Sequence, residues 1–336
     1  MPSARAIKKR IRSTRNIAQI TKAMEAVSAV KMRKSQAVAL RSRPYALAAL
    51  EILKNLSPST GLGAGGGIGV EDQTLSPLLE QRPVQKICLV VVTSDKGLAG
   101  AFNSNVLRRT LDFIRNNDSI LQDPKRSRGT EGLERSRRID VIAVGKKGRD
   151  FLKKRDIRVV DEITGIGDWA LPEQTKPIAE KLAKLYAAKE YDEIYVVYAN
   201  FLSVLKQEVV IEKALPFTKE GIEKRIQEII PQRGRYSGTP QALGRTEAKK
   251  VSYVFEPSPQ DVLKELLPLL LEIQVYHIIL EANASEHSAR MVAMKNASEN
   301  ASELIDSLTL SYNKARQAQI TKELTEITSG AAALEI

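Results

Sequence analysis

The chain has 336 residues, enough for one large domain or two of ordinary size, and its 43% hydrophobic content is sufficient for a buried core. Its formal net charge is +12, and its single cysteine, Cys88, excludes a disulfide within the chain and indicates a reducing compartment. We find no apolar run of about eighteen residues, so we expect no membrane span, no secretory signal and a mature chain that starts near Met1.

The first segment is strongly basic and has the pattern of a helix. Residues 1–44 hold twelve Lys and Arg against one acid, Glu25. Neither Gly nor Pro occurs from residue 3 to residue 43, and a 3-4-3 apolar spacing predicts a helix whose inner face carries Ile17, Ile20, Met24 and Val27. We expect this helix to stop or kink at Pro44.

The middle of the chain alternates strands with helices. The predicted strands cover 86–95, 138–145, 157–163 and 192–201, followed by closing strands at 207–217 and 251–257. The predicted helices cover 103–117, 146–155 and 172–191, the last with a bend at Pro177. This alternation predicts an α/β fold with a mostly parallel sheet. Residues 57–83, 122–138 and 231–250 have the composition of exposed loops.

The C-terminal segment has the pattern of a second long helix. No Gly or Pro interrupts residues 269–329, and residues 260–336 hold eleven acids and six bases, so the two ends of the chain carry opposite charge. A 3-4 alternation predicts a coiled-coil seam, and Gly330 a C-cap. The seam residues are Met294, Ala297, Ala301, Leu304, Leu308, Ser311, Ala315 and Ala318, continued after a phase shift by Ile320, Leu324, Ile327 and Ala331.

These patterns divide the chain into four parts. We expect an N-terminal coiled-coil helix (1–57), a Gly/Pro-rich loop (58–83), a Rossmann-like α/β domain (84–257) and a C-terminal coiled-coil helix (258–336). The fold class is therefore α/β, with the sheet domain inserted between two long helices.

Signals of catalysis or cofactor binding are weak. "GLGAGG" at 61–66 formally matches a dinucleotide fingerprint, but neither a strand precedes it nor a helix follows. "TSDKGLAGAFN" at 93–103 does join a strand to a helix, yet it lacks the Gly-Lys-Ser/Thr of a phosphate loop. His277 and His287 have no Cys nearby and fit helix-surface or core positions. We therefore predict no catalytic residue, no metal and no cofactor.

The basic helix could in principle face nucleic acid, a membrane or another helix. No aromatic residue precedes Tyr45 to stack on a base, and the apolar face lacks the Trp, Phe or several Leu usual in membrane-surface helices. Pairing with the acidic C-terminal helix, together with an acidic external partner, explains the charge better. Two rival classes remain: a nucleotide-binding α/β enzyme and a basic coiled-coil nucleic-acid protein.

Four stretches together closely resemble the gamma subunit of the rotary ATP synthase. They are "ITKAMEAVSAVKMRKSQ" (20–36), "SDKGLAGAFN" (94–103), "EHSARMVAMKNASENASELI" (286–305) and "YNKARQAQITKELTEITSGAAALE" (312–335), and they keep the family's order over nearly the whole chain. The resemblance implies an antiparallel coiled coil that acts as a non-catalytic central rotor shaft. It couples ion translocation at the membrane c ring to ATP synthesis or hydrolysis on the beta subunits.

The resemblance also implies partners and contact residues. One copy would sit in a ring of alpha and beta subunits, with the epsilon subunit and the c ring at its foot and without nucleic acid. The residues implied to contact beta levers and loops are Met24, Lys31, Arg33, Lys34, Lys96, Ala99, Arg316, Gln317, Thr321 and Glu323; those implied to form the foot on the c ring are Phe201, Gln207 and Glu208.

This sequence also departs from members of the family. Many relatives carry cysteine where Ala99 stands, and chloroplast relatives carry a paired-cysteine regulatory insertion that a chain with only Cys88 cannot form. We therefore expect a bacterial protein, peripheral to the cytoplasmic face of the inner membrane.

Overall fold

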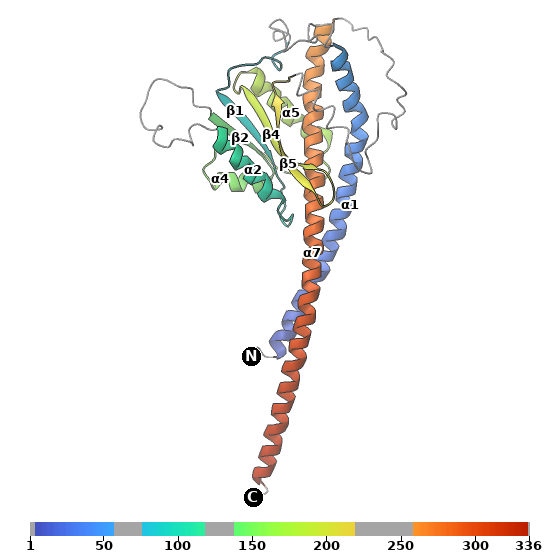
Figure 1. Ribbon diagram of the computed structural model, residues 1–336, viewed down its shortest axis with the longest axis vertical. Helices are drawn as coiled ribbons and strands as arrows, with labels where there is room; N and C mark the ends of the chain where they lie inside the picture. The colour runs from blue at the N-terminus through green and yellow to red at the C-terminus, as the bar shows by residue number, and fades with distance from the viewer. Residues whose placement is uncertain (1–3, 57–75, 118–137, 219–257, 335–336) are drawn as a thin grey trace, which may run out of the picture. The chain divides into compact units, whose positions relative to one another are not determined.

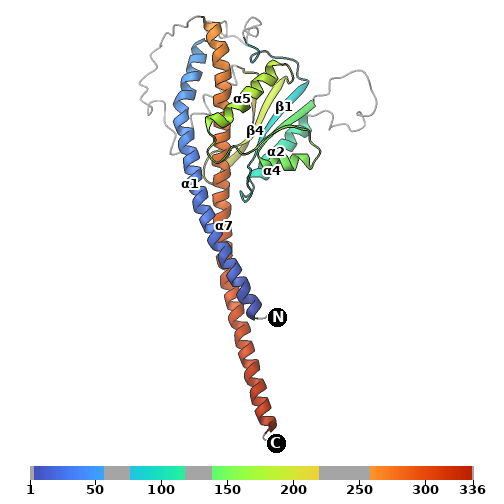
Figure 2. The same ribbon diagram turned by 180° about the vertical axis from the view of Figure 1, so that it is seen from behind.

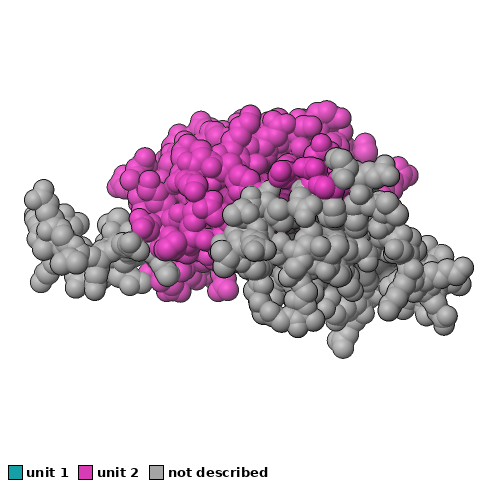
Figure 3. All heavy atoms as spheres, turned by 90° about the horizontal axis from the view of Figure 1, so that it is seen from above, with its two compact units in different colours: residues 1–30, 98–100, 287–336 teal, residues 31–97, 101–286 magenta. Residues whose placement is uncertain are grey.

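The computed structural model describes residues 4–56, 76–117, 138–218 and 258–334. The expected strand at 251–257, the basic loop before residue 138, the loop at 231–250 and most of the Gly-rich loop lie outside these residues. The chain divides into two compact units, of which Figure 3 shows unit 2 in magenta. Unit 1 comprises 1–30, 98–100 and 287–336, and unit 2 comprises 31–97 and 101–286.

Unit 2 contains a five-stranded sheet with strand order β3-β2-β1-β4-β5 (Figure 1). Strands β1 (Lys86–Val92), β2 (Arg138–Val144), β3 (Val159–Ile163) and β4 (Glu193–Phe201) are parallel, and β5 (Gln207–Leu215) is antiparallel to β4. The last six residues of β1 are all buried, as expected for a central strand of a sheet that is covered on both faces. The expected parallel sheet is confirmed, and so is the closing strand at its antiparallel edge.

Helices cover both faces of this sheet (Figures 1 and 2). Helices α2 (Phe102–Asn117) and α4 (Lys146–Lys153) cover one face. Helix α5 (Pro172–Ala187), which contains Pro177, and the first part of α7 pack on the other, around a core that includes Cys88. The three predicted internal helices are thus confirmed. Because every crossover returns to the same edge, the carboxyl ends of β1, β2 and β3 lie together.

Both terminal helices continue through a residue at which the sequence signals predicted an end. Helix α1 spans Ala4–Leu56 and continues through Pro44, so the predicted stop there is wrong. Proline inside a helix costs about 3 kcal/mol, which the remaining turns of so long a helix can outweigh. Helix α7 spans Pro259–Leu334 and continues through Gly330, so the predicted C-cap is also wrong. Glycine costs only about 1 kcal/mol relative to alanine in a helix.

Within unit 1, α1 and α7 lie side by side and run in opposite directions in both ribbon views (Figures 1 and 2). Several residues of each helix are half-buried, and on each helix one row of fully or partly buried residues recurs every three or four positions. On α1 these residues are Ala4, Ile7, Ile11, Thr14, Ala18, Thr21, Glu25 and Ser28; on α7 they are Met291, Met294, Ser298, Ala301, Ile305, Leu308, Tyr312 and Ala315. A contact of 3.5 Å between the Ser298 hydroxyl and the Ala18 carbonyl joins the two rows.

The α1 row is shifted by one residue from the expected inner face. Ile17, Ile20 and Val27 are 51, 59 and 54% exposed, whereas Thr21 and Ser28 are buried. Both hydroxyls donate to carbonyls of their own helix, at 3.0 Å for Thr21 to Ile17 and 2.7 Å for Ser28 to Met24. Since these bonds satisfy the polar groups, small hydroxyl residues can fill the buried row, and the larger apolar side chains remain outside.

The compact units cross the domain boundaries expected from the sequence. Each terminal helix contributes one part to unit 1 and another to unit 2, with divisions after Val30 and Glu286. The four-part division at 57, 83 and 257 stays a prediction.

Candidate partner-binding surface

The side chain of Asp168 brings together two lysines that lie far apart in the sequence. Asp168 follows β3, Lys31 belongs to α1, and Lys96 follows β1; all three are in unit 2. The Lys31 ammonium is 2.5 Å from the Asp168 carboxylate, and the Lys96 ammonium is 3.9 Å from the same oxygen. Lys31 and Asp168 are about three-quarters buried, whereas the Lys96 side chain is 70% exposed. Two of the lysines implied to contact beta levers are therefore neighbours.

Trp169, the next residue of the same loop, contacts Lys34, a third residue implied to contact beta levers. The Lys34 ammonium lies 3.8 Å from the centroid of the Trp169 ring, in a cation–π contact. Arg33, between the two lysines on α1, is exposed. The sequence reading missed both Asp168 and Trp169, although the only tryptophan of the chain stands in "GIGDW" just after a strand end, where functional side chains of parallel sheets gather.

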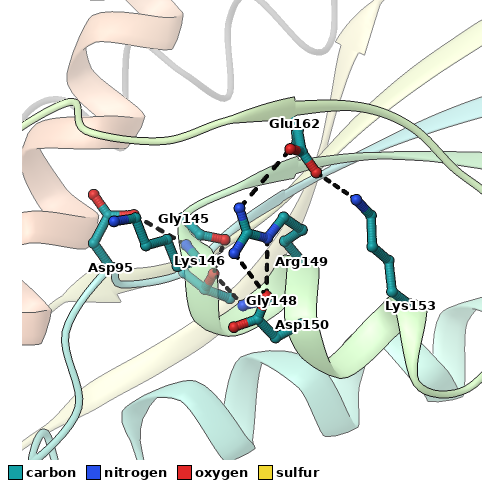
Figure 4. Close-up of polar contacts among 9 residues, drawn as sticks. Asp95, Gly145, Lys146, Gly148, Arg149, Asp150, Lys153 and Glu162 are labelled. Atoms are coloured by element: carbon teal, nitrogen blue, oxygen red, sulfur yellow. Dashed lines mark hydrogen bonds and ion pairs between the residues drawn. The ribbon is translucent and has the colours of Figure 1, made fainter.

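Asp95 ties the loops of this sheet edge to one another. Its carboxylate accepts one hydrogen bond from the backbone N–H of Lys146, at 3.0 Å, and another from that of Gly165, at 2.9 Å. Lys146 is the first residue of α4, so the carboxylate lies where a helix N-terminus favours negative charge (Figure 4). Gly145, with φ of +93°, is required here because a Cβ would lie 2.2 Å from the Thr93 carbonyl oxygen.

Helix α4 is fixed to β3 by ion pairs shown in Figure 4. Lys153 lies 2.6 Å from Glu162, and Arg149 lies 3.8 Å from the same carboxylate. Arg149 also bonds to Asp150 at 2.8 Å, and this hydrogen bond is the main cause that raises the pKa of the guanidinium. Arg149 is half-buried and its partners are exposed, so these ion pairs contribute little each and orient the helix more than they stabilise it.

A cavity of about 80 Å³ opens at this edge of the sheet, but its chemistry is wrong for a nucleotide. Its lining includes the carboxylates of Asp95, Asp168 and Glu286. A phosphate placed at the start of α4 would meet the Asp95 carboxylate that already bonds there. Within the described ranges, no three His, Cys, Asp or Glu side chains are placed to hold a metal ion, and no helix is long and apolar enough to cross a bilayer.

The other residues implied to contact beta lie in unit 1. Met24 is half-buried, and Arg316, Gln317, Thr321 and Glu323 are all exposed on α7. The Thr321 hydroxyl donates to the Gln317 carbonyl at 3.0 Å, which leaves its outer side accessible. Ala99 differs from them, because it is only 2% exposed. Its neighbour Gly100 approaches α7, where an added Cβ would be 3.6 Å from Ala293, so the Ala99 loop packs within unit 1.

The residues implied to form the foot belong to the β4–β5 hairpin. Phe201 and Gln207 form the last strand pair before the turn of the hairpin. Glu208 is exposed, and Leu205, in the turn, is 82% exposed. The carboxyl end of β4 lies beside Ser285, whose hydroxyl donates to the Ala199 carbonyl at 2.9 Å. The contact of this hairpin with a c ring stays a prediction.

Comparison with known proteins decides the family. A family model described as "ATP synthase" matches residues 3–334. Over 335 residues, the chain is 41% identical to the ATP synthase gamma chain of Pelotomaculum thermopropionicum, with 100% of each chain covered, and 43% identical to that of Roseiflexus castenholzii, with 99% of each covered. The chain belongs to the ATP synthase gamma family. The resemblance of its four stretches to that family is thereby confirmed.

Chains in solved structures of ATP synthases have a similar fold. A chain from the OSCP/F1/c-ring structure of the Euglena gracilis mitochondrial ATP synthase matches with a TM-score of 0.59 at 19% identity, covering 98% of this chain and 94% of that one. A chain from the central stalk/c-ring structure of the Tetrahymena thermophila mitochondrial enzyme matches with a TM-score of 0.54 at 22% identity, covering 83% and 99%.

Proposed function

We propose that this chain is the central rotor shaft of an ATP synthase, which transmits rotation between a membrane c ring and a catalytic ring of alpha and beta subunits. The observation that carries the proposal is identity of 41–43% over essentially the full length to gamma chains. ATP synthesis and hydrolysis take place on the beta subunits in this proposal, and the chain itself is not catalytic.

The shaft is the antiparallel pair of α1 and α7, which we propose to be a coiled coil. The 3-4 spacing of buried residues on both helices supports this geometry. Half of the residues in these two rows are Ala, Ser or Thr, so the two backbones can approach closely at those positions. Every residue of α7 from Arg316 to Gly330 is exposed. This exposure is expected for the tip of a shaft that other subunits cover.

Coupling follows from the asymmetry of such a shaft. A rod that turns inside a three-fold ring presents a different side to each beta subunit, so the three are held in different conformations and nucleotide affinities. In this chain the contacts would come from Met24, Arg33 and the lysines around Asp168, and higher on the shaft from Arg316, Gln317, Thr321 and Glu323. Exposed ion pairs contribute about 0–1 kcal/mol each, so the basic groups can guide an acidic lever without holding it permanently.

The buried Ala99 has a packing role in this proposal. It fixes the loop that follows Lys96, and the exposed lysine makes the contact. The remaining partners are one epsilon subunit and the c ring, and the complex is peripheral to the cytoplasmic face of a bacterial inner membrane. The curated bacterial gamma chains support the bacterial assignment.

Rotation of a labelled chain tests the function directly. Leu205→Cys places a reactive thiol at an exposed site, while Cys88 is buried and does not compete. The variant chain would be assembled with alpha and beta subunits. The ring of alpha and beta subunits would be fixed to a surface, and a bead would be attached to the new cysteine. We expect ATP to drive rotation of the bead in one direction. A ring that hydrolyses ATP around a stationary bead, or assembles without the chain, would contradict the proposal.

A further inference from the structure

Two residues of the loop between β3 and α5 contact the basic side chains that the proposed function assigns to an acidic partner. Asp168 contacts Lys31 and Lys96, and the adjacent Trp169 contacts Lys34. These three cations come from two separate elements of unit 2. Two successive residues of one loop therefore reach every lysine assigned to the lever contact.

The chemistry of these contacts is that of the expected partner. An acidic segment offers carboxylates to the lysines, and Asp168 already offers one, 2.5 Å from Lys31. Because Lys31 and Asp168 are about three-quarters buried, water and salt screen their pair less than an exposed pair. Lys96 lies at the rim, 3.9 Å from the same oxygen. A carboxylate of another chain would therefore compete with Asp168 at Lys31 and would meet the repulsion of the Asp168 carboxylate near Lys96.

We propose that Asp168 is an internal competitor that sets how tightly Lys31 and Lys96 hold acidic segments of the catalytic ring. In the free chain it neutralises Lys31 and orients Lys96. When an acidic segment arrives, the lysines exchange one carboxylate for another, so the net gain is small and the contact can be released as the shaft turns. Asp168 is thus a positioning residue for the contact with the acidic segment. Trp169 orients Lys34 through its cation–π contact. The inference rests on the proposed function.

Asp168→Asn tests the competition because the amide keeps the shape of the side chain and removes its charge. In the assembled complex of this chain with alpha and beta subunits, the freed lysines should hold acidic segments longer. We expect ATP turnover at low ionic strength to fall about two- to fivefold, the scale of one partly exposed ion pair, and to recover as added salt screens the contact.

The matched control is Asp161→Asn. Asp161 lies on β3 and has a similar exposure of 28%, but its ion pair, at 2.5 Å, is with Lys181 and not with any of the three lysines. Asp161→Asn should leave turnover and its salt dependence unchanged. Asp168→Glu, which keeps the charge, should turn over like the wild-type complex.

A second substitution shows whether Asp168 acts through Lys31. In a Lys31→Gln background, Asp168→Asn should lose most of its effect, because the cation it frees is absent. Folding of the loop is checked in the full chain by the emission of Trp169, the only tryptophan, and by the melting temperature.

The possible results distinguish a failure of this inference from a failure of the proposed rotor function. Equal turnover of the Asp168→Asn, Asp161→Asn and wild-type complexes would overturn the inference and leave the rotor assignment intact. The same loss in Asp168→Glu as in Asp168→Asn, or full additivity with Lys31→Gln, would also overturn it. A wild-type chain that does not assemble with alpha and beta subunits would instead contradict the proposed function.

Discussion

The hydroxyl of Ser298 lies 3.5 Å from the backbone carbonyl oxygen of Ala18, so these two residues face each other across the two helices of unit 1. A side chain can reach a backbone atom of a neighbouring helix only when the residues between them are small. Ala18 and Ser298 both belong to the rows of buried residues, which advance by three and four positions along each helix. One pair of residues therefore defines which sides of α1 and α7 face each other.

A cysteine pair at these positions should detect the register. We expect the Ala18→Cys, Ser298→Cys double variant to form a disulfide under mild oxidation, because both side chains belong to the buried rows. The control pair, Ile17→Cys with Ser298→Cys, moves the first thiol to an exposed position one residue away. Gel mobility before and after reduction measures both. Faster oxidation of the control pair would show that Ile17, as the sequence suggested, faces α7.

The thiol of Cys88 should be unreactive in the folded chain. Burial, aided by the nearby charge of Asp140, raises the pKa of the thiol, so the nucleophilic thiolate is not formed near neutral pH. Because the only cysteine is buried, a thiol reagent should label no site in buffer and one site after unfolding. Labelling of the native chain within minutes would contradict this placement.

The same shift predicts the direction of a pH effect on stability. The pKa of Cys88 is higher in the folded state than its ordinary value of 9.0, so the folded chain retains the proton that the unfolded chain releases. This contribution to the free energy of unfolding is intact below about pH 9 and declines as the pH rises further. Denaturant titrations from pH 7 to 10.5 measure the slope. In Cys88→Ala, which lowers stability at every pH, that part of the slope should be absent.

The sequence allowed the sheet to be predicted well because its signals are local. The run that forms β1 is apolar after Lys86, the run that forms β2 ends in four apolar residues, and each is followed by an amphipathic helix, so a covered parallel sheet was the expected result. The helix ends were less predictable, since Pro44 and Gly330 are unfavourable in a helix by only a few kcal/mol, and the rest of each long helix outweighs them.

The buried row on α1 and the centre of the candidate site were missed for different reasons. Hydrophobicity favoured Ile17, Ile20 and Val27 as the inner face, but Thr21 and Ser28 bond their own helix and can be buried, which apolar periodicity does not reveal. The grouping of Lys31 and Lys96 around Asp168 depends on three elements meeting in space, and no local pattern encodes it.

Gly145 should be sensitive to substitution in a way that Gly330 is not. In Gly145→Ala the Cβ would lie 2.2 Å from the Thr93 carbonyl oxygen, at a φ of +93° that alanine rarely adopts. We expect a loss of about 2–4 kcal/mol in the free energy of unfolding, combining the clash with backbone strain. Gly330→Ala, with nothing within 4 Å of its Cβ, should leave the stability unchanged or raise it by up to about 1 kcal/mol. Urea denaturation of both variants makes the comparison.

The exposed apolar residues at the end of α7 should matter for the complex and not for the chain alone. Ile320, Leu324 and Ile327 are 48, 58 and 68% exposed. Their replacement together by serine should therefore change the melting temperature of the isolated chain little. If other subunits cover this tip, the same triple variant should lower the yield of assembled complex or its ATP-driven rotation.

The control for this last prediction is a residue that the chain itself buries. Met294 is 5% exposed within unit 1, and Met294→Ala should destabilise the isolated chain by about 2–5 kcal/mol, the usual range for such a core truncation. Met294→Ala should thus change the thermal unfolding of the isolated chain, whereas the triple serine variant should change assembly or rotation of the complex. A triple serine variant that assembles and rotates like the wild type would mean that the apolar side of the tip does not contact a partner.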